Sequence, residues 1–164
     1  MNDIRMLIGG ERLAASQGQF FERCNPLDGS VATRAPAGTP ADACAAVDAA
    51  AQAFELWSSK GPGERRALLQ KAAAVLQAMT PRFISTMAAE TGAAAPWAGF
   101  NVHLAAGMLQ EAAALTTQIS GEHIPSDVPG SVALAVRAPA GVVLGIAPWN
   151  APIILGVRDR KSVV

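Results

Sequence analysis

The spacing of apolar and polar positions divides the chain into a strand-rich beginning, a helical middle and an extended end. Up to residue 37, short apolar runs alternate with turn-forming residues. They predict a hairpin over residues 5–13 that turns at Gly9-Gly10, and strands over residues 19–24 and 30–35. From residue 39 the apolar positions recur every three or four residues, which is the period of an amphipathic helix. The pattern therefore predicts a small meander of exposed hairpins followed by helices.

The first helix has a well-marked start. Thr39 suits the N-cap, Pro40 suits the first helical position, and Asp42 falls in the first turn, where the helix dipole favours an acidic side chain. The helix is expected to end near Ser58, before Gly61-Pro62-Gly63. Its many alanines predict close packing against neighbouring elements.

Three more helices are expected after this one. The second follows residue 63, the third ends at about Glu90 before a stop at Gly92, and the longest covers residues 94–119. The second carries an apolar stripe at helical spacing: Leu68, Leu69, Ala72, Val75, Leu76 and Met79. The longest is predicted to have an inner face made of Trp97, Asn101, Leu104 and Met108.

The end of the chain changes character again. Residues 121–130 are expected to form a polar loop, and residues 131–137 alternate in the manner of a half-exposed strand. Residues 142–147 are continuously apolar and rich in β-branched side chains, which is typical of a strand covered on both faces in a parallel sheet. Together these elements predict an α/β fold.

Composition narrows the classes of protein. Hydrophobic residues make up 51% of the 164 residues and charged residues 16%, which is too apolar for a disordered chain. The 13 basic and 13 acidic residues give a net charge of zero, with no block of like charges, so neither nucleic acid nor an anionic membrane is indicated. Cys24 and Cys44 form no Cys-x-x-Cys pair, and no His pair has metal-ligand spacing. We therefore expect no metal site, and reduced thiols in a cytoplasmic protein without a secretory signal.

A membrane-spanning helix is an alternative for residues 138–157, which contain no charged side chain and are long enough to cross a bilayer. Three prolines, Gly141, Gly145 and Asn150 interrupt this stretch. Since such residues are rarely so dense in a membrane helix, a buried strand followed by a turn is the favoured interpretation.

The predicted strand ends in Pro148-Trp149-Asn150, and in open α/β sheets ligands bind beyond the carboxyl ends of the strands. The amide of Asn150 can donate two hydrogen bonds, and the flanking prolines stiffen its backbone. A rigid donor of this kind suits stabilisation of a developing oxyanion. From spacing alone, however, an Asn that merely satisfies nearby backbone groups in a turn is the favoured interpretation.

A resemblance to a known family makes the oxyanion-donor role of Asn150 the favoured interpretation instead. The segment Gly-Val-Val-Leu-Gly-Ile-Ala-Pro-Trp-Asn-Ala-Pro at residues 141–152 resembles the segment that leads into cofactor binding in the aldehyde dehydrogenase superfamily. Residues 97–103 resemble the members that act on aromatic aldehydes, especially salicylaldehyde dehydrogenases, with vanillin and benzaldehyde dehydrogenases as neighbours. Other landmarks also match: Ile8-Gly9-Gly10, Asn25-Pro26, Ala53-Phe54 with Trp57, Arg65-Arg66, Glu90-Thr91-Gly92 and Gly121-Glu122.

The resemblance implies an incomplete aldehyde dehydrogenase fold. It would consist of N-terminal β-hairpins, a bundle of about four helices, an oligomerisation-type strand near residues 131–137 and the first strand of a Rossmann-like parallel sheet. Residues 1–158 would be the N-terminal part of the cofactor-binding domain. These enzymes oxidise an aldehyde to the carboxylic acid with NAD or NADP through a cysteine thiohemiacetal, and homo-oligomers are expected of the full-length protein.

Site residues follow from the same resemblance. Asn150 would donate to the oxyanion of the tetrahedral intermediate. The cofactor cleft would be lined by Ile146, Ala147, Pro148 and Trp149. The aldehyde would meet Trp97, Leu104 and Met108, for which plain core packing is an equal alternative. Arg158, about two helical turns after Asn150, would meet a phenol or another polar ring substituent, unless it is simply an exposed Arg near a helix end.

Part of the family's chemistry has no match in the sequence. The resemblance implies that the catalytic cysteine and the general-base glutamate lie downstream of Asn150, and neither Cys24 nor Cys44 has the nucleophile's context. The pattern breaks after Arg158, so residues 159–164 are expected to be a non-native tail. These 164 residues alone are therefore expected to be inactive and prone to aggregate. The alternative function is a non-catalytic oligomerisation module that pairs through residues 131–137.

Overall fold

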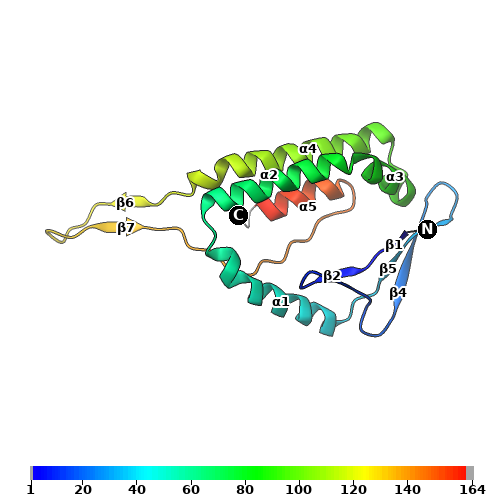
Figure 1. Ribbon diagram of the computed structural model, residues 1–164, viewed down its shortest axis with the longest axis horizontal. Coiled ribbons are helices and arrows are strands. Elements are labelled where there is room, and N and C mark those ends of the chain that lie inside the picture. The colour runs from blue at the N-terminus through cyan, green and yellow to red at the C-terminus, as the bar shows by residue number, and fades with distance from the viewer. Residues whose placement is uncertain (1, 162–164) are drawn as a thin grey trace.

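The computed structural model describes the backbone of residues 2–161 and the side chains of residues 3–158. Figure 1 shows a small β region near the N-terminus, a layer of helices beside it, and a long hairpin that projects from the far end of that layer. The α/β class agrees with the prediction from the sequence.

The N-terminal strands form two separate sheets. The first strand pairs parallel to the fifth, which in turn pairs antiparallel with the fourth. The second and third form an antiparallel hairpin, and Gly9 and Gly10 turn it with φ angles of 59° and 86°. The predicted hairpin over residues 5–13 and the strands near residues 19–24 and 30–35 are therefore present, but they lie in two separate sheets and do not form the predicted meander. The strands are β1 (Asn2–Asp3), β2 (Met6–Ile8), β3 (Glu11–Leu13), β4 (Phe20–Cys24) and β5 (Val31–Pro36).

Helix α1 (Pro40–Ser58) begins at the predicted capping residues. The carboxylate of Asp42 accepts the backbone N–H of Thr39 at 2.8 Å, and the Thr39 hydroxyl accepts the N–H of Asp42 at 3.3 Å, which completes a capping box. Asp42 also accepts the backbone N–H of Ser16 at 3.2 Å, so the preceding loop is tied to the helix start. The hydrogen bond from the Thr39 N–H, the largest effect, lowers the pKa of Asp42 below its ordinary value of 3.8.

The predicted close packing of α1 is wrong. None of its residues is buried, and Leu56 is 70% exposed. The helix touches the β2–β3 hairpin, where an added Cβ on Gly9 would lie 3.9 Å from the Cβ of Ala49, and it lies apart from the other helices in Figure 1. High alanine content lets a helix approach a neighbour closely, but it does not supply that neighbour.

The helical layer is built around α4 (Ala95–Leu115), against which α2 (Pro62–Ala78), α3 (Thr80–Thr91) and α5 (Pro152–Lys161) all pack. A short 3-10 turn (Thr116–Gln118) extends α4. The bundle of about four helices is thus present, although α5 takes the place expected for α1. Its core contains Leu69, Ala73, Leu109, Ala112 and Ala113, with Leu76 and Val157 packed against them.

The stripe predicted on α2 is rotated. Leu69 is buried as expected, but Leu68 and Val75 are 43% and 51% exposed, and Ala73 is buried instead. The reason is that α2 meets α4 along one narrow face. On that face the Nε of Arg66 also donates to the carbonyl oxygen of Ala113 at 3.2 Å.

Two contacts attach the β region to α3. The hydroxyl of Thr33 on β5 donates to the carboxylate of Glu90 at 2.5 Å. Gly92, at the predicted helix stop, adopts a left-handed φ of 67°, and an added Cβ there would lie 3.1 Å from Pro26. The turn between β4 and β5 therefore lies against the end of α3.

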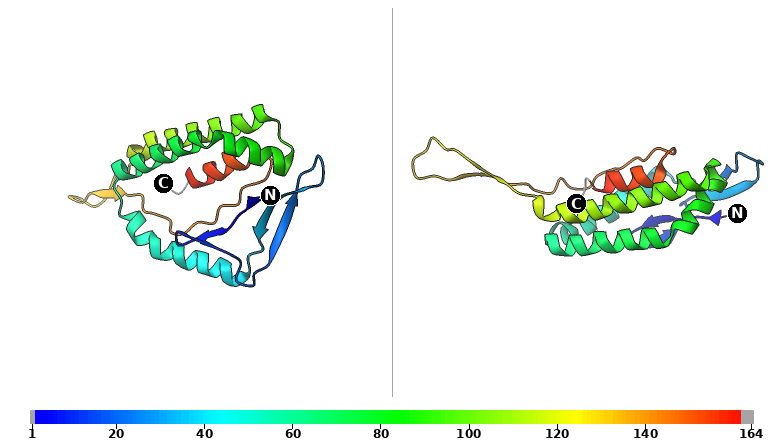
Figure 2. Two further views of the ribbon diagram at one scale, coloured as in Figure 1. Left: turned by 45° about the vertical axis from the view of Figure 1, so that its right-hand side comes forward. Right: turned by 90° about the horizontal axis from the view of Figure 1, so that it is seen from above.

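The projecting hairpin consists of β6 (Glu122–Ile124) and β7 (Ala133–Ala135), paired antiparallel. The strand expected near residues 131–137 is present as β7, but the expected loop at 121–130 begins with a strand. Figure 2 shows the hairpin extending well beyond the helices, and every residue of its two strands except Ala133 is exposed.

Residues 142–147 do not form the predicted strand of a parallel sheet. They cross between α1 and the helical layer, as Figure 1 shows, and pair with no other strand in the described part of the chain. A β-strand requires neighbours that accept its backbone hydrogen bonds, and none lies beside this segment. We call residues 138–148 the strap. The proposed non-native tail remains a prediction: α5 continues to Lys161, and residues 162–164 lie outside the described residues.

Candidate functional site

Pro148-Trp149-Asn150 forms the turn between the strap and α5. Pro152 is the first residue of the helix, and the N–H of Leu155 donates to the carbonyl oxygen of Ala151 at 3.0 Å. Asn150 therefore lies just before a helix start, in a backbone that prolines restrict on both sides.

The side chain of Asn150 is exposed and makes no hydrogen bond to another described residue. An Asn that served only to satisfy its own turn would bond a nearby backbone group, as Asn25 does when it accepts the N–H of Leu27 at 2.9 Å. The amide of Asn150 is thus available to donate to a bound molecule.

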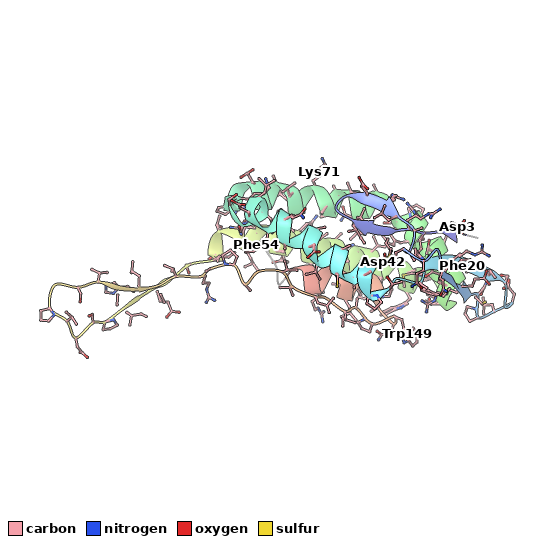
Figure 3. All side chains as sticks on the ribbon, turned by 90° about the horizontal axis from the view of Figure 1, so that it is seen from below. Asp3, Phe20, Asp42, Phe54, Lys71 and Trp149 are labelled. Carbon is pink, nitrogen blue, oxygen red and sulfur yellow. The ribbon has the colours of Figure 1, made fainter. Side chains whose placement is uncertain are left out.

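The four residues predicted to line a cofactor cleft are also exposed. Ile146 and Trp149 have 79% and 71% of their surfaces accessible, and Figure 3 shows Trp149 at the edge of the molecule. An added Cβ on Gly156 would lie 4.0 Å from the Cβ of Ala147, so the end of the strap runs alongside α5. The segment therefore exposes apolar side chains beside backbone groups that pair with no strand of the described residues.

The predicted substrate residues of α4 lie at different depths. Leu104 and Met108 are half-buried, as expected for an inner face. Trp97 is 45% exposed and stacks on Phe100, with ring centroids 5.7 Å apart, so its place on the inner face is wrong. Trp97 lies between the inner and outer faces of α4, so its exposure depends on the side chain that it packs against. That side chain is Phe100, which is also exposed.

Asn101 is the most deeply buried polar residue of this helix, with no exposed surface. Its Nδ2 donates to the carbonyl oxygen of Trp97 at 3.0 Å, one turn earlier. Its Oδ1 is buried and has no partner among the described residues. Sequence spacing placed Asn101 on the inner face, but it gave no signal that this side chain anchors the turn that carries Trp97.

Packing of α5 on α4 brings the two parts of the predicted site into one layer. Ile154 of α5 is 5% exposed, and Val157 joins the α2–α4 core. The two helices run in the same direction in Figure 1, so Trp97 and Asn150, near their starts, lie at the same end of the layer. Arg158 is exposed and lies toward the other end.

Other kinds of site receive no support from the described residues. They contain no group of three or more His, Cys, Asp or Glu side chains that could hold a metal ion. Cys24 and Cys44 are free, exposed thiols, and His103 and His123 are exposed. Among helices in the described range, none is both long and apolar enough to cross a membrane.

A sequence profile described as "Aldehyde dehydrogenase family" matches residues 13–161, which is most of the chain. The chain belongs to the aldehyde dehydrogenase family. The vanillin dehydrogenase of Pseudomonas fluorescens is 58% identical to it over 158 residues, which are 96% of this chain and 33% of that protein. The family predicted from the Pro-Trp-Asn segment is therefore confirmed.

Solved structures of family members share the fold. The crystal structure of a salicylaldehyde dehydrogenase from Pseudomonas putida G7 complexed with salicylaldehyde matches with a TM-score of 0.96 at 42% identity, over 98% of this chain and 33% of that one. An NAD-dependent benzaldehyde dehydrogenase from Corynebacterium glutamicum matches with a TM-score of 0.91 at 29% identity, over 96% of this chain and 35% of that one. The chain thus spans about a third of the length of these family members.

Proposed function

We propose that this chain forms the N-terminal third of an NAD(P)-dependent aldehyde dehydrogenase that oxidises an aromatic aldehyde to the carboxylic acid. The observation that carries the proposal is the turn at Asn150. It holds an uncommitted amide donor on a restricted backbone at the start of α5, in the sequence context that marks the family. The relatives named for vanillin, salicylaldehyde and benzaldehyde support an aromatic substrate.

In this proposal Asn150 donates from Nδ2 to the oxygen of the substrate carbonyl as that oxygen gains negative charge. The nucleophile that attacks the carbonyl carbon belongs to the part of the enzyme that this chain does not span. A preorganised donor acts because it is oriented before the charge develops, and loss of one such donor typically lowers the rate by about 10²–10³-fold.

In this proposal the remaining site residues bind and orient the cofactor and the aldehyde. Ile146, Ala147, Pro148 and Trp149 would hold NAD or NADP, which when bound supplies the hydride acceptor. Leu104 and Met108 would form an apolar wall for the aldehyde ring, and the exposed Trp97 would border its entrance. Arg158 would donate to a phenolic oxygen on the ring.

A chimera tests the proposal directly. Residues 1–158 would replace the matching third of the Pseudomonas fluorescens vanillin dehydrogenase, and NADH formation with vanillin would be followed spectroscopically. We expect an active enzyme whose kcat falls about 10²–10³-fold in Asn150→Ala, while Gln110→Ala, a change at an exposed position of α4, leaves kcat unaltered. An inactive but folded chimera, or an Asn150→Ala variant within twofold of the parent, would contradict the proposal.

A second candidate function is that of a non-catalytic oligomerisation module, and the β6–β7 hairpin favours it. Val132, Leu134 and Val136 are 71%, 63% and 80% exposed on this hairpin. An isolated two-stranded hairpin is marginally stable in water, so a partner strand would stabilise it. Co-purification of the 164-residue chain with a full-length relative, lost in Leu134→Lys and without nicotinamide-cofactor binding, would favour this function.

A further inference from the structure

Two exposed aromatic rings lie on the first turns of α4. Trp97 and Phe100 are 45% and 46% exposed, and their rings stack with centroids 5.7 Å apart and an interplanar angle of 24°. Stacked rings restrict each other, and the faces that they leave exposed can pack against a further aromatic ring. How well this pair binds another ring depends on how firmly the backbone that carries it is held.

The start of α4 lacks the usual groups that hold a first helical turn. Its N-cap is Ala94, whose side chain makes no capping hydrogen bond, and none of the described residues of its first turn is acidic. The first backbone N–H groups of a helix have no partner within that helix, so an uncapped end frays readily. The turn that carries Trp97 therefore depends on contacts made from further along the helix.

Asn101 supplies such a contact from the buried side of α4. Its side chain has no exposed surface, and its Nδ2 donates to the carbonyl oxygen of Trp97 at 3.0 Å. The backbone N–H four residues later is the ordinary helical donor to this oxygen, so the side chain adds a second bond from the same residue. Around this bond Ala98 is fully buried, and an added Cβ on Gly99 would lie 3.7 Å from the Cδ1 of Ile84 on α3. The hydrogen bond thus ties the Trp97 backbone to the packed core.

We infer that Asn101 is a positioning residue: through its hydrogen bond to the Trp97 carbonyl oxygen, it fixes the Trp97–Phe100 pair as a wall against which the aldehyde ring packs. This inference rests on the proposed function, in which Trp97 borders the entrance for the aldehyde. Asn101 has no exposed surface and acts only through Trp97. Its loss should therefore weaken the binding of an aromatic aldehyde and leave the chemical step at Asn150 unaltered.

The test measures KM and kcat for vanillin in the chimera described above. Asn101→Leu removes the donor and keeps a branched side chain. It should raise KM about two- to tenfold, the range that corresponds to one net hydrogen bond, while kcat stays within about twofold of the parent. Asn101→Thr keeps a hydroxyl that can donate to the carbonyl oxygen four residues earlier, so its KM should stay within about twofold of the parent. Gln110→Leu, at an exposed position of the same helix, is the matched control and should change neither constant.

Urea denaturation of the same variants separates positioning from a general structural role. Asn101→Leu should be at least as stable as the parent, because it removes the unsatisfied Oδ1, so its higher KM cannot result from partial unfolding. Asn101→Thr leaves a smaller side chain in the core and should be less stable, yet it should keep the KM of the parent. A side chain that only stabilised the fold would change stability and KM in the same direction.

A double-mutant cycle with Trp97→Leu shows whether the effect passes through this ring. In the Trp97→Leu background, Asn101→Leu should change KM by less than about twofold. The positioning role is overturned if Asn101→Leu leaves KM unchanged, if Asn101→Thr raises KM as much as Asn101→Leu does, or if Asn101→Leu has the same effect with and without Trp97.

A readout that needs no activity keeps this inference separate from the proposed function. In the chimera labelled with 5-fluorotryptophan, the ¹⁹F resonance of residue 97 is the one that Trp97→Leu removes. This resonance should broaden or split in Asn101→Leu and remain single in Asn101→Thr, and a single sharp resonance in both variants would overturn the positioning role. An inactive but folded chimera would instead contradict the proposed function, and the resonance of residue 97 would still report on positioning.

Discussion

The buried amide of Asn101 leads to a prediction about stability. Two effects oppose each other when Asn101 is replaced, and the larger one decides the sign of the change in the free energy of unfolding. Its Nδ2 bonds the carbonyl oxygen of Trp97 at 3.0 Å, but its Oδ1 is enclosed without a partner among the described residues. Asn101→Leu keeps a branched side chain of four heavy atoms and removes both polar groups. The substitution therefore loses one hydrogen bond and relieves one unsatisfied acceptor.

Typical free energies indicate that removing the unsatisfied acceptor has a larger effect than losing the hydrogen bond. A hydrogen bond between neutral groups contributes about 0.5–1.5 kcal/mol net, whereas a buried polar atom without a partner costs about 1–3 kcal/mol. The carbonyl oxygen of Trp97 stays inside α4 and keeps its helical bond. We expect Asn101→Leu to raise the free energy of unfolding by about 0–2 kcal/mol. Asn101→Asp places an acceptor against the Trp97 carbonyl and buries a charge, so it should lower that free energy by at least about 2 kcal/mol.

Urea denaturation followed by circular dichroism at 222 nm measures both changes. Gln110→Leu, on an exposed position of the same helix, is the control and should stay within about 0.5 kcal/mol of the parent. If Asn101→Leu lowers the free energy of unfolding by more than about 1 kcal/mol, the reasoning is refuted, because Oδ1 must then bind a donor such as an internal water.

Three further predictions concern the fold. Leu109→Ala, at an 8% exposed core position, should lower the free energy of unfolding by about 2–4 kcal/mol in the same denaturation assay; an effect no larger than that of Leu56→Ala on α1 would show that the core lies elsewhere. The pKa of Asp42 is lower in the folded state than in the unfolded state, so its contribution to the free energy of unfolding is present above pH 3.8 and is lost as the pH falls through the folded-state pKa. The urea midpoints of the parent protein and of Asp42→Ala should therefore differ at pH 7 and converge at low pH. A difference that stays constant with pH would contradict this. Gly121→Ala should force the β6 and β7 backbones apart, because an added Cβ overlaps a carbonyl oxygen of the opposite strand; faster amide exchange in this hairpin, absent from Gly107→Ala, is the expected result.

Local features were predictable because nearby residues decide them. Thr39, Pro40 and Asp42 specify the start of α1 through a capping box that closes within one turn, and Gly92 ends α3 because it tolerates a left-handed backbone. The family could also be recognised from the Pro-Trp-Asn segment, since two prolines, one on either side of Asn150, are an unusual combination. The identity of the aldehyde stays a prediction, because relatives named for vanillin, salicylaldehyde and benzaldehyde all match this chain.

Other features depend on elements that are distant in sequence. The helical spacing of apolar residues on α2 could not predict that Leu69 and Ala73, rather than Leu68 and Val75, pack against α4. Nor could spacing show that Trp97 stacks on Phe100 at the surface, or that Asn101 lies beneath it. Such outcomes depend on which neighbouring element lies on each side of the helix.

By itself the sequence determined where α1 begins and where α3 ends, which residues turn the N-terminal hairpins, the α/β class and the candidate role of Asn150. Only the tertiary structure decided that α5 replaces α1 in the bundle and that, within the described residues, the segment 142–147 pairs with no strand and the buried Nε of Arg65 has no hydrogen-bond partner. The physical reason is the range of the forces involved. Caps and turns are satisfied within a few residues, whereas a buried strand and a packed helix exist only when another surface lies against them.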